Sequence, residues 1–222
     1  MNFSMKMESK FYMQKFINKA IFLDRDGTLI AGASLKKRKA PGYVSSIREI
    51  KILPGALQAL KLFQQTGYLL VVVTNQSAVA RGFFTEKYLQ RINRHLQKQF
   101  ARHGIILKKI YYCPHYPPPV AGQAEGIVKR YRRKCRCRKP EPGLLLKAKK
   151  EFGLNLKKSV MVGDSLRDIG AGRRAGTKTV LVLTGQGRKT LKNLSRKERE
   201  KIDLIAPTLL KTTRWIKKLS TK

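Results

Sequence analysis

The stretch FLDRDGTLI, residues 22 to 30, places two aspartates one residue apart at the end of an apolar run, followed directly by Gly27 and Thr28. Carboxylates are scarce in this chain, which has 13 acidic residues against 49 basic ones. A short, continuous apolar run is typical of a strand that is buried on both faces, and such strands belong to parallel sheets. The stretch therefore predicts a strand of a parallel sheet with two carboxylates at its carboxyl end.

Further apolar runs extend this sheet along the chain. Strands are predicted at 19–24, 68–74, 105–112, 159–164 and 179–183, with helices between them at 54–66, 85–103 and 142–152. Strands that alternate with helices indicate a doubly wound α/β fold, in which ligands bind beyond the carboxyl ends of the strands. We therefore expect the residues that follow these strands to share one rim of the sheet.

Two helical segments carry patterns that assign their faces. Thr85 is suited to cap the helix at 85–103, Gly104 follows its end, and its apolar stripe is assigned to the core: Leu89, Ile92, Leu96 and Phe100. The segment at 208–219, TLLKTTRWIKKL, predicts an amphipathic closing helix with Trp215 against the sheet.

Length and charge bound the class of protein. A chain of 222 residues can bury the core of one domain, so we expect a single domain at 19–222 after an N-terminal extension at 1–18. No apolar run is long enough to span a bilayer, and the N-terminus lacks the apolar core of a signal peptide, so we expect a cytoplasmic protein without a membrane partner. The net charge of +36 is compatible with anionic partners, but its spread along the chain favours a solvated basic surface.

The paired aspartates have a chemical interpretation. Asp24 and Asp26 are separated by one residue, so we expect both to point to the same side as the strand ends. Two neighbouring carboxylates repel unless a cation lies between them, and oxygen ligands favour Mg²⁺. An ionised carboxylate can attack phosphorus without a base, which predicts Asp24 as nucleophile and Asp26 as general acid and base. The alternative is a polar turn after a strand.

Other predicted strand ends supply what phosphoryl transfer needs. Thr74 and Asn75 close the second strand, Lys139 stands in CRKPEPG, and Asp164 in VGDSLRD offers a third carboxylate for a metal. Such chemistry depends on positive charge and hydrogen-bond donors around the phosphoryl oxygens.

The order of these motifs resembles the haloacid dehalogenase (HAD) superfamily of aspartyl phosphatases: DxDGT, a strand ending in TN, a lysine before proline, and GDxxxD, from about residue 21 to 183. The resemblance implies Asp24 as nucleophile, Asp26 as acid and base, and Thr74 and Lys139 as holders of the phosphoryl oxygens. It implies a Mg²⁺ site formed by Asp24, Asp26 and Asp164. Asp168 would orient the site from behind, unless it is a plain helix-surface aspartate.

The cysteines form a second pattern. Cys113-Pro-His115 and Cys135-Arg-Cys137 use all three cysteines and one of the three histidines, and they fit a closed tetrahedral Zn²⁺ site. Such a site would pin the loop at 113–137 and hold Arg138 and Lys139 against the rim. The alternative is that each cysteine is a small buried apolar residue.

The combination CPH and CxCRKPxPG resembles one branch of the superfamily, which contains the D-glycero-D-manno-heptose 1,7-bisphosphate 7-phosphatases and the histidinol-phosphatases. TNQSAVARGFFTE at 74–86 and GYV at 42–44 resemble the heptose enzymes, whereas histidinol enzymes carry NQDG in the corresponding place. The resemblance implies Mg²⁺-dependent removal of the 7-phosphate, for activated heptose in lipopolysaccharide or surface glycans. It implies substrate contacts from Thr74, Asn75, Gln76 and Ser77, Arg138 on the remote phosphate, and Gly42 and Tyr43 beside the sugar.

The chain departs from that branch at several positions. Ala78 replaces a glycine, residues 33–41 lengthen the approach to GYV, nineteen residues separate His115 from Cys135, and Ser165 stands where the heptose enzymes often have lysine. We expect the loop at 113–137 to stand in place of a large cap domain, and the protein to be a monomer.

Two other functions remain open at this point. One is histidinol-phosphatase activity, and the other is nucleic-acid binding or end processing through KRYRRKCRCRK at 129–139. No recognisable nucleic-acid module is present, so a phosphorylated sugar is the expected partner and a specific nucleic acid is not.

Overall fold

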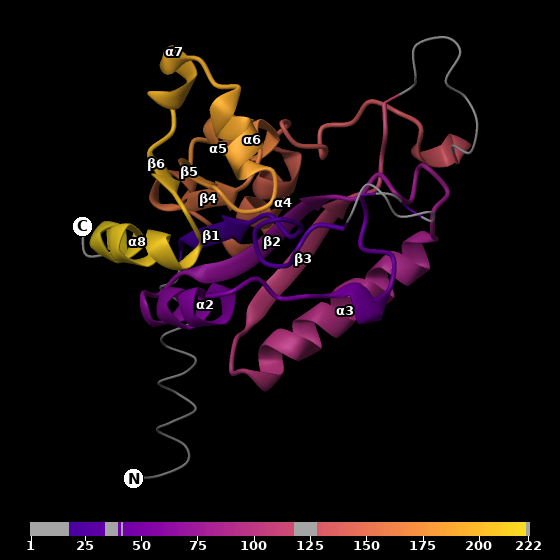
Figure 1. Ribbon diagram of the computed structural model, residues 1–222, viewed down its shortest axis with the longest axis horizontal. Helices are drawn as coiled ribbons and strands as arrows, with labels where there is room; N and C mark the ends of the chain where they lie inside the picture. Colours follow the sequence, from indigo (N-terminus) through magenta and orange to yellow (C-terminus); the bar gives the residue numbers. More distant parts are fainter. Residues whose placement is uncertain (1–17, 34–39, 41, 118–127, 221–222) are drawn as a thin grey trace.

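Six parallel strands form one sheet in this computed structural model, which describes residues 18–33, 40, 42–117 and 128–220 (Figure 1). Their order across the sheet is β3-β2-β1-β4-β5-β6. The strands are β1 (Ala20–Leu23), β2 (Leu69–Asn75), β3 (Leu107–Cys113), β4 (Val160–Gly163), β5 (Lys178–Val182) and β6 (Leu204–Ala206). The predicted doubly wound parallel sheet is confirmed.

The strand that precedes the paired aspartates lies at the centre of the sheet. Ile21 of β1 pairs with Leu70 of β2 on one side and with Val160 of β4 on the other. All four residues of β1 are buried, as expected for a strand covered on both faces. The order of the strands reverses between β1 and β4, and in sheets of this type that switch point opens a crevice at the carboxyl ends.

Helices cover both faces of the sheet (Figure 1). On one face α2 (Ala56–Gln65), α3 (Glu86–Arg102) and α8 (Thr213–Ser220) bury apolar side chains against β1 and β2, and on the other α4 (Gly143–Phe152) and α5 (Leu166–Ala175) do so. Two short helices, α6 (Gly187–Lys192) and α7 (Arg196–Arg199), lie between β5 and β6. The 3-10 turns are η1 (Ile47–Glu49), η2 (Lys129–Tyr131), η3 (Leu156–Lys158) and η4 (Leu210–Thr212).

The helix α3 shows why the sequence pattern was informative. The Thr85 side chain accepts a hydrogen bond from the Tyr88 backbone N–H at 3.2 Å, which caps the first turn. Gly104 adopts a φ of 74° just beyond the helix end, a conformation that glycine adopts without strain. The predicted stripe is fully buried: Leu89, Ile92, Leu96 and Phe100.

The C-terminal region differs from the prediction in its bounds. The helix expected at 208–219 begins at Thr213, because Leu210–Thr212 form the separate turn η4. Ile216 is completely buried and Trp215 is partly buried against the apolar cluster that includes β1 and α2. Strand β6 and helices α6 and α7 were not predicted, since each is too short to show a hydrophobic period.

The structure describes one sheet, and its described residues form no cap domain above the rim, as expected. Among these residues, no helix combines the length and apolarity that crossing a membrane requires. The predicted extension at 1–18 lies outside the described residues except for Asn18, and the lengthened segments at 33–41 and 116–134 are described only in part.

Candidate active site

The predicted site residues gather at the carboxyl ends of the central strands. Asp24 follows β1, Thr74 lies at the end of β2, and Asp164 follows β4. They line a cavity of about 620 Å³ together with Lys139, which comes from the loop between β3 and α4. The switch point of the sheet thus contains a cavity whose lining is polar and includes both acidic and basic side chains.

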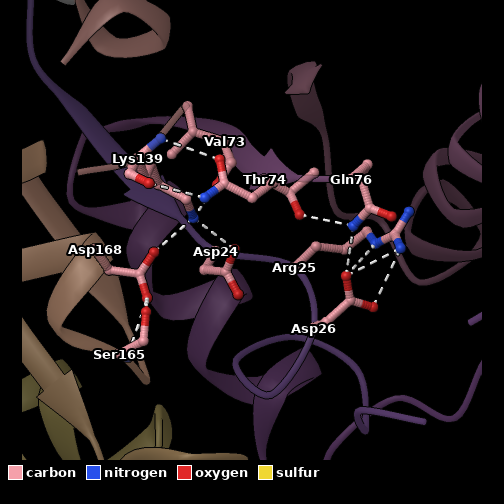
Figure 2. Close-up of polar contacts among 10 residues, drawn as sticks. Asp24, Arg25, Asp26, Val73, Thr74, Gln76, Lys139, Ser165 and Asp168 are labelled. Atoms are coloured by element: carbon pink, nitrogen blue, oxygen red, sulfur yellow. Dashed lines mark hydrogen bonds and ion pairs between the residues drawn. The ribbon is translucent and has the colours of Figure 1, made fainter. Parts of the chain in front are cut away.

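Lys139 is the buried cation of this site, with 2% of the residue exposed. Its Nζ lies 2.6 Å from Asp24 Oδ1, 2.5 Å from Asp168 Oδ1 and 2.7 Å from the Val73 carbonyl oxygen (Figure 2). Burial alone would lower the pKa of Lys139, but the two carboxylates outweigh it and raise that pKa above its ordinary value. The ammonium group is therefore charged and fixed by three acceptors.

A reciprocal amide contact fixes the backbone of the same lysine. The Asn75 side chain donates to the Lys139 carbonyl oxygen and accepts from the Lys139 backbone N–H, both at 3.0 Å. Asn75 closes β2, so this pair of hydrogen bonds attaches the loop after β3 to the rim of the sheet.

Three carboxylates converge around Lys139. One oxygen each from Asp24, Asp164 and Asp168 lies within 4.8 Å of the others, and all three residues are buried. Asp168 is held at the start of α5, where its Oδ2 accepts from the Ser165 backbone N–H at 3.0 Å and from the Ser165 hydroxyl at 2.6 Å. The capping box of α5, formed by Ser165 and Asp168, thus fixes the Asp168 carboxylate at the wall of the site.

Two glycines make room for Asp164. A Cβ atom at Gly27 would lie 2.0 Å from Asp164 Oδ2, and one at Gly185 would lie 2.1 Å from the same oxygen. That oxygen also accepts from the Gln186 backbone N–H at 2.7 Å. The carboxylate is therefore seated in a cradle that any side chain at either glycine would fill.

The electrostatics of the carboxylates call for a cation. Burial raises the pKa of Asp24 to about 8, and repulsion from Asp168 and Asp164 adds to the effect while Lys139 opposes it. Burial and the charge of Asp168 likewise raise the pKa of Asp164 to about 6. One ammonium offsets only one of three carboxylates, so the charge that remains matches a divalent ion with oxygen ligands. These residues fit Mg²⁺.

Asp26 lies apart from this carboxylate group, although it lines the same cavity (Figure 2). Its carboxylate accepts from Arg25 at 3.0 to 3.2 Å and from Gln76 Nε2 at 2.6 Å. Arg25 is completely buried, and its Nη1 donates to Asn93 Oδ1 on α3 at 2.8 Å. The side chains of Asp24 and Asp26 thus face different partners, because the strand ends at Leu23 and its alternation does not continue.

The predicted substrate contacts divide into two groups. Gly42, Tyr43, Asn75, Ser77 and Arg138 line the cavity, and the Tyr43 and Ser77 hydroxyls lie 2.8 Å apart. Gln76 is completely buried outside the lining, where its Nε2 bonds both Asp26 and the Thr74 hydroxyl oxygen, the latter at 2.9 Å.

The cavity also contains residues that the sequence did not single out: Arg81, Phe83, Arg167 and Gln186. Arg81 stands within TNQSAVARGFFTE, so its motif was visible but its role was not. Arg167 lies two residues after Ser165, which stands where the heptose enzymes often have lysine. The short distance in sequence between Arg167 and Ser165 could have indicated that Arg167 supplies the positive charge expected from that lysine.

The cysteines and His115 meet as one cluster. The Cys137 Sγ lies 3.2 Å from Cys113 Sγ, 3.3 Å from Cys135 Sγ and 3.3 Å from His115 Nδ1. A tetrahedral site with Zn–S distances of about 2.3 Å has S···S edges of roughly 3.7 Å, so the donor set and its spacing fit zinc. Hydrogen bonds from Cys113, Cys135 and His115 lower the pKa of the Cys137 thiol to about 5, while contact with Cys137 and burial raise the pKa values of Cys113 and Cys135.

Comparison with known proteins identifies relatives of this chain. A family model described as HAD-hydrolase-like matches residues 136–212. The D-glycero-beta-D-manno-heptose-1,7-bisphosphate 7-phosphatase of Haemophilus ducreyi is 41% identical over 194 residues, covering 86% of this chain and 94% of the relative. The protein of the same name from Escherichia coli K12 is 41% identical over 169 residues, covering 75% and 80%.

Solved structures give the same result. The D,D-heptose 1,7-bisphosphate phosphatase from B. bronchiseptica, complexed with magnesium and phosphate, aligns with a TM-score of 0.70 and 32% identity over 89% of this chain and 97% of that one. The D,D-heptose 1,7-bisphosphate phosphatase from Burkholderia thailandensis aligns with a TM-score of 0.58 and 26% identity over 88% and 96%.

Proposed function

The chain belongs to the D-glycero-beta-D-manno-heptose-1,7-bisphosphate 7-phosphatase family of HAD-like hydrolases, and from this membership we propose that it removes the 7-phosphate of that sugar bisphosphate. The product would serve the synthesis of nucleotide-activated heptose. The observation that supports the proposal most strongly is the buried Lys139, bonded to Asp24 and Asp168 at the rim of a polar cavity.

Asp24 is the proposed nucleophile. Lys139 holds its Oδ1, whereas its Oδ2 accepts no hydrogen bond from any residue that the structure describes. That oxygen would attack phosphorus, forming a phosphoaspartate as the bond from phosphorus to the sugar oxygen breaks. Water would then cleave the phosphoaspartate and release phosphate.

Asp26 is the proposed general acid and base. It would give a proton to the departing sugar oxygen and later take one from the attacking water. Arg25 and Gln76 fix its carboxylate at the cavity wall, so we assign Gln76 to positioning Asp26 and Thr74. Because the Thr74 oxygen already accepts from Gln76, its own O–H is free to donate to a phosphoryl oxygen beside the Lys139 ammonium.

Mg²⁺ is the proposed catalytic cofactor, held by Asp24 and Asp164, with Asp168 behind them and Asp26 as a further candidate at the same cavity. When bound, it would supply positive charge that favours ionised carboxylates and neutralises the phosphoryl oxygens. The related B. bronchiseptica enzyme was crystallised with magnesium and phosphate. Zn²⁺ is the proposed structural ion of the cluster Cys113, His115, Cys135 and Cys137.

The rest of the cavity is assigned to the sugar and its second phosphate. Arg138 would bind the phosphate that is not hydrolysed, while Gly42, Tyr43, Asn75 and Ser77 border the sugar. We propose that the enzyme acts as a monomer and without a nucleic-acid partner. Three free thiols in one cluster suit a reducing compartment such as the cytoplasm.

Phosphate release from a substrate panel tests this function. The panel contains both anomers of the heptose bisphosphate, histidinol phosphate, p-nitrophenyl phosphate and a 5′-phosphorylated oligonucleotide, with Mg²⁺ present. We expect the highest kcat/KM for one heptose anomer, and a preference for histidinol phosphate or the oligonucleotide would refute the proposal.

A matched pair of variants tests the mechanism. Asp24→Asn should abolish turnover and leave the fold intact. Asp203→Asn should retain activity, because Asp203 pairs with Lys178 just before β6 and does not line the cavity. Turnover by Asp24→Asn at the wild-type rate would exclude Asp24 as nucleophile.

A further inference from the structure

A tyrosine of the Cys/His loop contacts two arginines of the cavity wall. The Arg81 Cζ lies 4.1 Å from the centre of the Tyr116 ring, and the Arg138 Cζ lies 5.4 Å from it. Both arginines line the cavity, yet Tyr116 does not. The tyrosine therefore touches the site only through these two guanidinium groups.

The backbone of Tyr116 is fixed by the loop around it. The Tyr116 N–H donates to the Tyr131 carbonyl oxygen at 3.1 Å, and Tyr116 forms an isolated parallel bridge with Arg132. On its N-terminal side, His115 belongs to the cluster with Cys113, Cys135 and Cys137. The ring thus belongs to a residue whose backbone is held by a hydrogen bond and that follows the Cys/His cluster directly.

The same loop also fixes Arg138 from the other side. Arg138 Nη1 donates to the His115 carbonyl oxygen at 3.0 Å, one residue before the ring that it contacts. Arg138 is therefore held by a backbone acceptor and an aromatic face at once. Both come from two consecutive residues at the cluster.

The two arginines carry uncompensated charge. Neither forms an ion pair with a carboxylate of the described residues, and the buried Arg81 Nε has no hydrogen-bond partner there. An aromatic face attracts cations through its quadrupole without neutralising them, so the pair remains available to an anion.

We propose that Tyr116 is a positioning residue, which holds Arg81 and Arg138 in place to bind the phosphate of the substrate that is not hydrolysed. This rests on the proposed function, since it concerns the second phosphate of a sugar bisphosphate. Tyr116 acts on substrate binding and not on the chemistry at Asp24. The Cys/His cluster is then coupled to substrate affinity through this ring and through the His115 carbonyl oxygen.

A purely structural role makes a different prediction. Tyr116 packs beside a small apolar cluster formed by Val79, Ala80, Leu89 and Tyr131. Were packing its only contribution, loss of the ring would reduce stability and would affect all substrates alike. Tyr112 packs against the same cluster without any arginine contact that the structure records, and it therefore serves as the matched control.

The test compares Tyr116→Leu, Tyr116→Phe and Tyr112→Leu on two substrates. For the heptose bisphosphate, we expect Tyr116→Leu to raise KM about tenfold with little change in kcat, as for an arginine that loses a partly desolvated aromatic partner. For p-nitrophenyl phosphate, which has no second phosphate, KM and kcat should stay at wild-type values. Tyr116→Phe keeps the ring and should behave like the wild type, as should Tyr112→Leu.

Further measurements keep the proposal testable if Tyr116→Leu is unstable. In a double-mutant cycle, Tyr116→Leu should raise KM less in an Arg81→Gln background than alone, because it acts through Arg81. Bound zinc and the melting temperature, measured on every variant, report damage to the loop. An unchanged KM for the bisphosphate, or equal losses on both substrates, would overturn the proposal.

One control separates this proposal from the proposed function. If the wild type hydrolyses p-nitrophenyl phosphate but not the heptose bisphosphate, the function is wrong. The role of Tyr116 is then read from inhibition of that reaction by fructose 1,6-bisphosphate. A higher inhibition constant in Tyr116→Leu than in the wild type supports this role, and an unchanged inhibition constant refutes it.

Discussion

Replacing Arg25 with methionine tests how the site is built into the core. Arg25 is completely buried and pairs with Asp26, whose side chain is 26% exposed, and it donates to Asn93 Oδ1. Breaking a buried pair costs about 3 to 5 kcal/mol, but the exposed part of Asp26 recovers some solvation, which reduces that loss to about 2 kcal/mol. The unsatisfied oxygen of Asn93 adds about 1 to 2 kcal/mol. We therefore expect the free energy of unfolding to fall by about 3 to 4 kcal/mol.

Activity should fall for a related reason. Without Arg25, the Asp26 carboxylate loses donors that orient it and keeps only Gln76. Since a positioned general acid contributes about 10² to 10⁴ in rate, we expect kcat to fall roughly a hundredfold in Arg25→Met. The KM for p-nitrophenyl phosphate should change little, because the proposed phosphoryl contacts of Lys139 remain.

Urea denaturation and steady-state kinetics measure the two effects. The control is Arg91→Met on the exposed face of α3, which should cost less than about 0.5 kcal/mol. The double variant Arg25→Met/Asp26→Asn should regain part of the lost stability, since it removes the unpaired charge. A loss below about 1 kcal/mol in Arg25→Met would refute the reasoning, because it would mean that the pair contributes no more than a buried apolar side chain.

Three further perturbations address the proposed metal sites. Gly185→Ala should weaken Mg²⁺ binding at least about tenfold in a titration, since its Cβ would lie 2.1 Å from Asp164 Oδ2. Gly104→Ala, also at positive φ but in open space, should leave Mg²⁺ affinity unchanged. If Gly185→Ala binds Mg²⁺ as tightly as the wild type, the cradle around Asp164 is contradicted. With Mg²⁺ omitted, stability should fall as the pH rises from about 4 to 8, because the Asp24 pKa of about 8 exceeds its ordinary 3.8 and the folded state binds the extra proton. Added Mg²⁺ should flatten this dependence of melting temperature on pH. A melting temperature that rises with pH when Mg²⁺ is omitted would refute the raised pKa of Asp24. Cys135→Ser should lower bound zinc, measured by mass spectrometry, and the melting temperature together; full zinc content would contradict the cluster.

The sequence was sufficient for the central strands because their signal is local. A run such as YLLVVVT is continuous and apolar, and it lies between helices with recognisable ends. Strand β6 has only three residues, Leu204–Ala206, and its burial depends on pairing with β5, which no local pattern records. Its assignment required the tertiary structure.

The site shows the same division. The sequence predicted Asp24, Thr74 and Asp164 at one rim, because parallel strands share the direction of their carboxyl ends. The orientation of Asp26 could not be predicted, since residues after Leu23 leave the strand and their direction depends on the buried Arg25. A charged arginine with no exposed surface is rare, and its partner Asn93 lies 68 residues away.

The amide contact between Asn75 and Lys139 makes the position of the lysine at the rim independent of the loop that precedes it. Two hydrogen bonds to Asn75 at the end of β2 fix the position of Lys139, so this position does not depend on the length of the loop that carries the lysine. We therefore expect that residues between Tyr116 and Cys135 can be lengthened, shortened or exchanged while the ammonium group keeps its place. The interval between His115 and Cys135, nineteen residues long in this chain, is therefore a position at which new specificity could be grafted with Tyr116 retained.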